Sequence, residues 1–446
     1  MSETNLTEST KAFAIQIVRR LVQAGFRAYF AGGCVRDMLR GETPKDFDVA
    51  TSATPEQVMQ LFRRTVPVGA AFGVVRVLSH DDPPIQIEVA TFRADATYSD
   101  GRHPDAVTFT DEIHDVKRRD FTVNGLLYDP RKDEVLDYVD GRRDLDRKLI
   151  RAIGDPRQRF AEDHLRMLRA VRFACNLGFE LDGATLDAIK ELAKNITAVS
   201  AERIRDEFSK MLTGANPRRA LELLKKTCLL KHILPEVDVM EGVKQPPQFH
   251  PEGDVWVHTL MLLGQLDHAP LTLTLGALFH DVGKPPTYEF SDRIRFNEHE
   301  HIGADMTEKI LTRLKYPNDV IQQAVSLVKQ HMVFKDVTHM RPATLKRFIR
   351  QSHFEEHLAL HRLDCIASHG DLSAFGFCQE EVNKQPPQAL RPAPLITGVD
   401  LIGLGLTPGP KFKTILKEIE DRQLEGALTT KDAALACARE MIGKLN

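Results

Sequence analysis

Two aspartates separated by one residue are the first side chains in this sequence whose type and spacing could support catalysis. Asp46 and Asp48 flank Phe47 in the segment KDFDV at residues 45–49. On a strand, side chains two positions apart face the same side, so both carboxylates would point away from a core that takes Phe47. Two like charges this close repel unless a cation lies between them, and carboxylates beside substrate phosphates suit Mg²⁺. Alone, the pair is more typical of a solvated strand face.

A glycine pair upstream of the aspartates could hold a phosphate. Gly32 and Gly33 follow a short strand expected at residues 28–31 and open a helix that contains Arg36. Glycines let backbone N–H groups approach an anion, and a guanidinium can clamp a phosphate. Most glycine pairs are only turns. Next to Gly32, Gly33 and Arg36, however, the two aspartates are better explained as a site than as a solvated strand face. Glu88, on the polar side of a strand expected at 85–90, is a candidate third carboxylate.

The elements that must position these residues form an α+β part followed by a helical part. Apolar residues from Phe13 to Leu21 predict a helix that ends at Gly25, after a short polar N-terminal tail. Strands are expected at residues 28–31, 46–50, 73–78 and 85–90. From about residue 155 onward, helices are expected and no strands. This change in the secondary-structure pattern, together with breaks rich in Pro, Gln and Lys, predicts domains at residues 1–140, 141–215, 216–385 and 386–446.

Composition limits the class of protein. The 446 residues allow about three domains, and 42% hydrophobic with 28% charged residues is typical of a globular chain. The net charge of −3 argues against a uniformly basic surface, yet ten basic and five acidic residues between Arg142 and Arg172 give a local charge of +5 that suits phosphates. With no membrane-spanning run, no signal peptide and six scattered cysteines, we expect a cytoplasmic protein that does not contact a membrane.

A second set of candidate ligands lies in the helical part. His280 and Asp281 are adjacent, with His258 upstream and Asp364 downstream. Imidazole and carboxylate groups together suit a divalent metal ion. One adjacent pair is no signal by itself, but the ordered set resembles the HD superfamily of metal-dependent phosphohydrolases.

The HD resemblance has further implications. His299 and His331 match accessory histidines that could serve a second metal or a phosphate. The identity of the metal and the substrate stay open, with 2′,3′-cyclic phosphates and 2′-nucleotides among the candidates. The alternative is a helical body without phosphohydrolase activity, which merely holds the substrate of the rest of the chain. The other histidines are expected to be surface or core residues, among them His250, His339, His353 and His357.

Four ordered motifs in the first 179 residues carry another resemblance. They are GGCVRDMLRG…PKDFDVAT (32–51), EVATFRADATYSDGRHPDAVTFT (88–110), RRDFTVNGLLYD (118–129) and a long segment from Tyr138 to Phe179. Together they resemble the class II tRNA nucleotidyltransferases and the bacterial poly(A) polymerases, of the polymerase-β-like nucleotidyltransferase superfamily. One departure is Asn124-Gly125, where that family usually has Asn-Ala, and glycine could loosen the helix there.

The resemblance implies an α+β fold class: a polymerase-β-like head with a mixed sheet, then an all-α neck, an HD body and a tail. It implies template-independent addition of CCA to the 3′ end of tRNA from CTP and ATP. Asp46 and Asp48 would hold Mg²⁺, which activates the RNA 3′-hydroxyl and stabilises the departing pyrophosphate. Residues implied to bind the nucleotide are Gly32, Gly33, Arg36, Arg119, Asp120, Asn124, Asp163, Arg166 and Arg169.

Asp163 and Arg166 are implied to select the nucleotide. Three positions apart on one helix, they would share a face and offer acceptors and donors that match the edge of C or A. Without the resemblance, a surface salt bridge is the simpler interpretation.

Several alternatives stay open. An enzyme that adds only the terminal A, and a poly(A) polymerase, share the head motifs. A loop through Arg93, Asp95, Arg102 and His103 argues against an enzyme that adds only CC. A further alternative is an HD phosphohydrolase whose head only binds RNA. The sequence does not indicate the oligomeric state.

Overall fold

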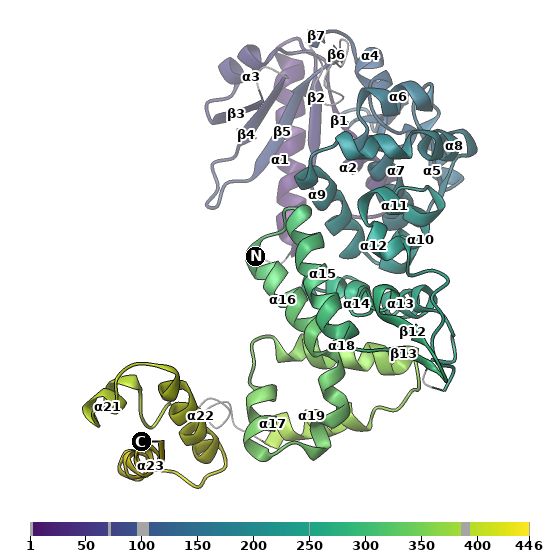
Figure 1. Cartoon of the computed structure of the whole chain (residues 1–446). Coiled ribbons are helices and arrows are strands. Elements are labelled where there is room, and N and C mark those ends of the chain that lie inside the picture. The colour runs from purple at the N-terminus through teal and green to yellow at the C-terminus, as the bar shows by residue number, and fades with distance from the viewer. Residues whose placement is uncertain (1–2, 70–72, 96–106, 249, 385–392, 446) are drawn as a thin grey trace. The chain divides into compact units, whose positions relative to one another are not determined.

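The chain divides into two compact units. In the computed structural model the described residues are 3–69, 73–95, 107–248, 250–384 and 393–445. The units comprise Met1–Asp238 and Val239–Asn446, and Figure 1 labels their helices and strands. Arg102 and His103, to which we assigned part of a loop, lie outside the described residues. The finer division into four domains stays a prediction.

A seven-stranded mixed sheet forms the centre of the first unit. Its strand order is β3-β4-β5-β2-β1-β8-β9, and of these neighbours only β2 and β5 run parallel. The four strands expected from the sequence are confirmed as β1, β2, β4 and β5. The strands of this unit are β1 (Ala28–Ala31), β2 (Asp48–Thr51), β3 (Thr65–Gly69), β4 (Val74–Leu78), β5 (Gln86–Thr91), β6 (Arg93–Asp95), β7 (Val107–Phe109), β8 (Leu126–Asp129), β9 (Glu134–Asp137), β10 (Leu149–Ile150) and β11 (Glu180–Leu181).

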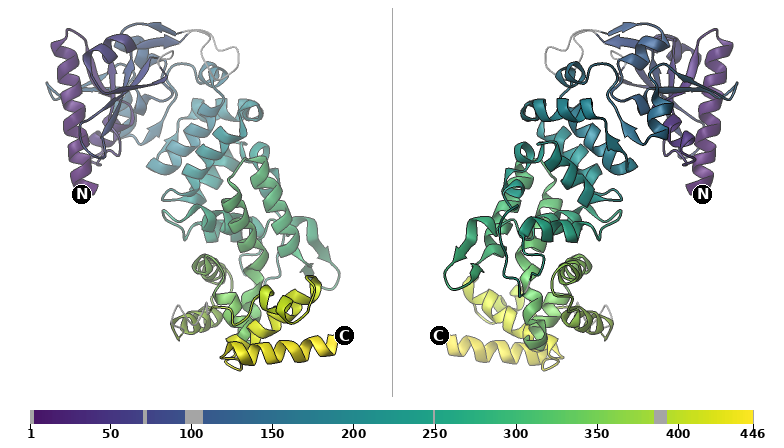
Figure 2. Two further views of the ribbon diagram at one scale, coloured as in Figure 1. Left: turned by 90° about the vertical axis from the view of Figure 1, so that its left-hand side faces the viewer. Right: turned by 90° about the vertical axis from the view of Figure 1, so that its right-hand side faces the viewer.

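One face of the sheet is covered by α1 (Glu3–Gln23), as Figures 1 and 2 show. The apolar stripe of this helix, including Ile17 and Leu21, packs with Val49 and Val89 of the strands into one core. Because side chains alternate along a strand, the neighbours of Val49 and Val89 point to the opposite face. The helix begins at Glu3, so the polar residues expected as a tail are mostly helical.

Helices complete the first unit, and the α+β fold class is confirmed. Asp155 caps the neck helix α6 through the N–H of Arg157, with Pro156 at its first position. The helices after α1 are α2 (Gly33–Leu39), α3 (Pro55–Leu61), α4 (Glu112–Lys117), η2 (Thr122–Asn124), α5 (Gly141–Asp146), α6 (Pro156–Glu162), α7 (Leu165–Leu177), α8 (Gly183–Leu192), η3 (Ala193–Ala198), α9 (Ala201–Leu212), α10 (Pro217–Lys226), α11 (Leu230–Ile233) and α12 (Pro235–Asp238).

Among its described residues, the regular structure of the second unit is helical apart from one ribbon, β12 (Tyr288–Phe290) with β13 (Ile294–Phe296). The expectation that no strands follow residue 155 was therefore wrong, because strands of two or three residues are too short to show a period. The helices are α13 (Val255–Leu263), α14 (Leu271–Phe279), η4 (Pro285–Thr287), α15 (His299–Arg313), α16 (Asn318–Gln330), η5 (His331–His339), α17 (Pro342–Ile349), α18 (Phe354–Ala367), α19 (Ser373–Lys384), α21 (Gly398–Gly403), α22 (Pro410–Leu424) and α23 (Lys431–Leu445).

Candidate active sites

A cavity of about 870 Å³ in the first unit gathers every head and neck residue implied to act on the nucleotide. The strands β1, β2 and β5 contribute one side of it, and α7 contributes another. Its lining includes Gly32, Gly33, Arg36, Asp46, Asp48, Glu88, Arg119, Asp120, Asn124, Asp163, Arg166 and Arg169, together with Arg118, Arg172, Phe173 and Lys210.

The carboxylates of the cavity lie on the sheet face opposite α1. Phe47 is buried in the core, whereas Asp46 and Asp48 are exposed to the cavity, as the period of two predicts. Asp48 lies beside Glu88 in the parallel pairing of β2 with β5. Desolvation by the cavity walls, and then repulsion from Glu88, raises the pKa of Asp48 to about 6, with Arg119 opposing the shift and Asp46 adding to the repulsion. Such a set fits a divalent cation, which would relieve the repulsion.

Glu88 is partly neutralised within the sheet. Its Oε1 lies 3.0 Å from Nη2 of Arg76, the residue opposite it on β4. A role as third carboxylate therefore stays a prediction.

The glycine turn lets an arginine approach the backbone. Gly32 has a φ of 75°, a conformation that favours glycine, and caps α2. A Cβ there would lie 3.2 Å from Nη1 of Arg119, and one on Gly33 would lie 3.6 Å from Nη2 of Arg36. Backbone N–H groups and two guanidinium groups thus meet in a small volume, which suits an anion such as a triphosphate.

A buried polar network fixes the other implied nucleotide-binding residues. Nη1 of Arg36 donates to Oδ1 of Asn124 at 2.7 Å, and Nδ2 of Asn124 donates to Oδ1 of Asp120 at 3.1 Å. Asp120 accepts from Arg169 at 2.7 and 2.9 Å. Although burial acts to raise it, the Arg169 guanidinium and the hydrogen bond from Asn124 lower the pKa of Asp120. The network holds these side chains in one arrangement before any ligand binds.

Asp163 and Arg166 do not lie on one helix, so that expectation was wrong. Asp163 ends α6 in an extended conformation, with φ −144° and ψ 105°, and α7 starts two residues later. Its Oδ1 accepts from the N–H of Leu165 at 3.0 Å and its Oδ2 accepts from Arg203 at 2.8 Å. Arg166 instead pairs with Glu162 at 2.5 Å. The simpler interpretation, a salt bridge between Asp163 and Arg166, is therefore not what the structure shows.

The glycine after Asn124 is closely packed. A Cβ on Gly125 would lie 2.8 Å from Cγ2 of Val139 and 3.1 Å from Cδ1 of Ile153. These side chains fill the space that an alanine would need, which accounts for the departure from the usual Asn-Ala.

Gly125→Ala is therefore expected to destabilise the protein. Overpacking of this kind costs about 1–3 kcal/mol, and urea denaturation monitored by circular dichroism would measure the change in the free energy of unfolding. Gly183→Ala is the control, since a Cβ there has nothing within 4 Å. Equal stability of the two variants would contradict the packing argument.

The positive charge of the basic neck segment, residues 142–172, is partly neutralised by ion pairs. Arg151 pairs with Asp144 at 2.5 Å and Arg172 pairs with Glu207 at 2.5 Å. Four residues at its start are exposed and form no ion pair with any residue that the structure describes, namely Arg142, Arg143, Arg147 and Lys148. These four are the cations of the segment best placed to contact a phosphate backbone.

In the second unit, the predicted HD residues converge from five elements, and four of them line a cavity of about 640 Å³, namely Asp281, His299, His331 and Asp364. Asp254 caps α13 and so starts the helix that carries His258. His280 and Asp281 follow α14, and Asp364 lies on α18. The accessory residues, His299 and His331, begin α15 and η5 respectively.

Asp281 joins two groups of histidines. Its Oδ2 lies 3.2 Å from Nε2 of His280 and 4.0 Å from Nε2 of His258. Its Oδ1 lies 3.6 Å from Nε2 of His299 and 4.0 Å from Nε2 of His331. One carboxylate thus faces two sets of imidazole nitrogens, an arrangement that could hold two cations.

The chemistry of these donors fits a divalent metal. Nε2 of His280 and Oδ2 of Asp281 are buried and make no hydrogen bond of correct geometry with a described residue. Although burial acts to raise it, the surrounding histidines and Lys284 hold the pKa of Asp281 well below its usual range. Burial, and then the neighbouring histidines, lowers the pKa of His331 to about 3, so this imidazole is neutral and able to ligate.

Glu252 and His250 belong to this centre, although the sequence pattern did not indicate them. Oε1 of Glu252 lies 2.7 Å from Nδ1 of His258 and 2.9 Å from Nδ1 of His250. Assigning His250 to the surface or core was incomplete, because it lies in the loop before α13 and lines the cavity. Burial acts to lower it, but hydrogen bonds to Asp364 and Glu252 raise the pKa of His258 to about 9.

Glu252→Gln is expected to weaken metal binding in the second unit by about 10–100-fold, because a carboxylate behind a ligating histidine orients the ring and raises its basicity. Competition with a chromogenic chelator would measure the affinity for Mn²⁺ or Zn²⁺. Glu308→Gln, on the exposed side of α15, is the control. An affinity equal to that of the control would exclude a positioning role for Glu252.

Three family matches cover parts of both sites. Residues 28–151 match the poly A polymerase head domain, residues 178–240 match the probable RNA and SrmB-binding site of polymerase A, and residues 254–369 match the HD domain. Both the nucleotidyltransferase and HD families generally use divalent metals, and the described residues include groups of suitable ligands. The class is thus a nucleotidyltransferase joined to an HD domain.

Relatives narrow the class. The CCA-adding enzyme of Levilactobacillus brevis is 34% identical over 426 residues, which cover 95% of this chain and 96% of the relative. That of Leuconostoc mesenteroides is 45% identical over 219 residues, 49% of this chain, and there the match spans about half (53%) of the relative. The chain belongs to the family of CCA-adding enzymes.

Solved structures agree with this assignment. The CCA-adding enzyme of Bacillus stearothermophilus, in complex with CTP, has a TM-score of 0.73 at 28% identity, over 97% of both chains. The Thermotoga maritima enzyme with tRNA shares the fold, with a TM-score of 0.59 at 18% identity over 98% of this chain and 95% of that one. Among the described residues, no helix is long and apolar enough to cross a membrane.

Proposed function

We propose that this protein adds CCA to the 3′ end of tRNA from CTP and ATP without a nucleic-acid template. The observation that carries the proposal is one cavity in which paired carboxylates, a glycine turn and the Asp163–Arg166 segment meet. Family membership supports the same activity. We propose that the protein acts in the cytoplasm, and its free cysteines are consistent with a reducing compartment.

In this proposal the cavity residues divide the work of binding and orienting. Asp46 and Asp48 would hold Mg²⁺, which when bound lowers the pKa of the 3′-hydroxyl and neutralises charge on the phosphates. Arg36 and Arg119, beside the Gly32 turn, would bind the triphosphate. Asn124, held between Arg36 and Asp120, would orient the ribose.

Asp163 and Arg166 would select the base. Their side chains come from the junction of α6 and α7 and not from one helical face, so each is fixed by its own partner. The Arg203 guanidinium orients the carboxylate of Asp163, and Glu162 orients the guanidinium of Arg166. A fixed acceptor and a fixed donor can match the base edges of C and A while rejecting those of G and U.

Asp163→Ala is expected to reduce discrimination against GTP and UTP by about 10–100-fold, since a good bidentate contact discriminates by about 1–3 kcal/mol. Ratios of kcat/KM for the four nucleoside triphosphates would measure it. Asp146→Ala removes an exposed acid of the neck and is the control. Discrimination equal to the control would refute the selection role.

The decisive experiment on the whole activity uses three tRNA substrates: one that lacks CCA, one that ends in C and one that ends in CC. CTP and ATP are supplied singly and together, and products are resolved on a sequencing gel. We expect all three to be completed to CCA and then to stop. Incorporation on the CC-ended substrate alone would mean A addition, and an extended tail of A would mean a poly(A) polymerase.

We also propose a second activity, hydrolysis of phosphate esters in the HD domain. The supporting observation is the buried pair His280 Nε2 and Asp281 Oδ2, 3.2 Å apart, beside a cavity to which Lys284 also contributes. A divalent metal held by His258, His280, Asp281 and Asp364 would supply a Lewis acid there. The four domains at residues 1–140, 141–215, 216–385 and 386–446 are part of this proposal, and limited proteolysis would test their boundaries.

A further inference from the structure

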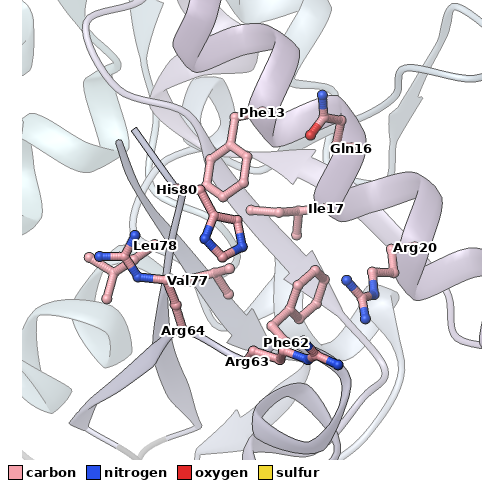
Figure 3. Close-up of a pocket in the computed structure, with 10 residues that line it drawn as sticks. All are labelled: Phe13, Gln16, Ile17, Arg20, Phe62, Arg63, Arg64, Val77, Leu78 and His80. Carbon is pink, nitrogen blue, oxygen red and sulfur yellow. The ribbon is translucent and has the colours of Figure 1, made fainter. Parts of the chain in front are cut away.

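A pocket of about 400 Å³ lies on the α1 side of the head sheet, away from the catalytic carboxylates. Figure 3 shows it between α1, which contributes Phe13, and the β3–β4 end of the sheet, which contributes Val77. Val77 belongs to the core shared with α1, whereas Asp48 and Glu88 point to the other face. The pocket is therefore separate from the nucleotidyltransfer site.

The floor of this pocket is apolar and partly aromatic. Ile17, Phe62 and Val77 are core residues at its base, and Phe13 is half-buried beside them. Phe13 and Leu78 are half-buried, so they supply the part of the apolar floor that is accessible from outside. Aromatic and aliphatic surface of this kind can receive the face of a flat ring.

The rim of the pocket is strongly cationic. Arg20, Arg63 and Arg64 are exposed, and none forms an ion pair with a residue that the structure describes. Most arginines that line the catalytic cavity, by contrast, are paired with carboxylates. Asp81 and Asp82 follow His80 in the chain but do not line the pocket, and no described lining residue is acidic.

Two of the arginines are held in place without being neutralised. The Cζ atom of Arg20 lies 5.2 Å from the centroid of the Phe62 ring. Nη1 of Arg64 donates to the carbonyl of Ser79 at 2.6 Å. Gln16 and His80 add hydrogen-bonding groups at the rim, as Figure 3 shows. Because Arg20 and Arg64 are already held in place, a ligand that binds at the apolar floor would lose little binding free energy to ordering these two side chains.

We propose that this pocket binds an unpaired nucleotide of an RNA strand. A base would lie on the apolar floor, Gln16 and His80 would meet its polar edge, and the arginines would contact the flanking phosphates. Guanidinium groups suit phosphates in particular, and aromatic surface flanked by arginine is the usual composition of sites for single-stranded nucleic acid. Because the three arginines are exposed at the rim, the site fits a strand that continues past it in both directions.

The test measures binding of a fluorescent oligouridylate, blocked by a 3′-phosphate, to the full-length protein by anisotropy at several salt concentrations. Arg20→Gln/Arg63→Gln replaces two exposed side chains that make no side-chain hydrogen bond or ion pair with a residue that the structure describes. We expect at least about a fivefold weaker affinity, and a log–log salt dependence reduced by about 1.4, since each phosphate on a single strand contributes about 0.7. Arg63→Glu alone should show the same loss.

The control Lys117→Gln/Lys132→Gln removes two exposed charges elsewhere on the head and should bind as the unmodified protein does. Photo-cross-linking with 5-iodouridine in the oligonucleotide should label peptides that contain Phe13 or Phe62. Equal affinity in all variants, or cross-links confined to the catalytic cavity and neck, would overturn the proposal. Competition by polyglutamate as strong as by polyuridylate would also overturn it, in favour of an acidic protein segment. The variants keep every residue of the catalytic cavity, so CCA addition to a short acceptor should be unchanged.

Discussion

Asp48→Asn is expected to lower kcat/KM for nucleotide addition by at least about 10³-fold while leaving tRNA affinity unchanged. A charged metal ligand beside the reacting phosphate supplies several kcal/mol of transition-state stabilisation, and each 1.36 kcal/mol is tenfold in rate. Asparagine keeps the shape and one oxygen but removes the charge. Incorporation of labelled CMP and AMP into tRNA would measure the rate, and gel shift would measure the affinity. Asp46→Asn should have the same effect.

The same variant separates a catalytic role from a structural one. In the metal-free protein, burial and the nearby Glu88 and Asp46 raise the pKa of Asp48 to about 6. A raised folded-state pKa means that ionised Asp48 destabilises the fold, fully so above about pH 6 and not at all below the ordinary pKa of an aspartate. Asp48→Asn should therefore unfold at the same or a higher temperature in EDTA at pH 7. Asp81→Asn, on an exposed loop of the head, is the control, and retained turnover in Asp48→Asn would remove Asp48 from the catalytic site.

The second large effect is expected in the HD domain. Asp281→Asn should abolish metal binding in the second unit and reduce phosphate-ester hydrolysis by at least about 10³-fold, because the two histidine sets share this one carboxylate. Metal analysis by mass spectrometry and hydrolysis of 2′,3′-cyclic AMP or p-nitrophenyl phosphate would measure the two losses. CCA addition should stay within about twofold, since the nucleotidyltransfer residues lie in the other unit.

Two companion variants make the outcome interpretable. Asp281 is buried next to Lys284 at 2.7 Å, so its replacement leaves a buried cation unpaired and could lower stability. His280→Ala removes a ligand without unpairing Lys284 and should show the same losses. His353→Asn, at an exposed position with a φ of 54° that asparagine tolerates, is the control. If His280→Ala and Asp281→Asn both hydrolyse phosphate esters like the control, the HD domain is a scaffold.

The local parts of both sites could be predicted from the sequence. The period of two around Phe47 correctly placed both aspartates on the face away from the core, and the glycine pair correctly indicated a tight turn before α2. The order of His258, His280, Asp281 and Asp364 indicated a shared centre, which the structure forms. In each case the signal is a short segment or an ordered set of rare residue types.

The remaining parts depend on contacts that no local pattern records. The helix expected to carry both Asp163 and Arg166 stops before Asp163, whose carboxylate instead accepts hydrogen bonds from Arg203 and from the N–H of Leu165. Glu252 lies in an irregular loop, so nothing periodic marks it, and only its 2.7 Å distance to His258 reveals its place.

The contact between Arg203 and Asp163 has a consequence for protein engineering. Arg203 lies on α9 and outside the cavity lining, yet it sets the direction of the carboxylate that is proposed to read the base. A mutant library confined to residues in contact with the nucleotide would therefore omit a position that, in this proposal, influences which nucleotides the enzyme accepts. Diversifying residue 203 together with 163 would explore substrate choice while the catalytic aspartates stay untouched.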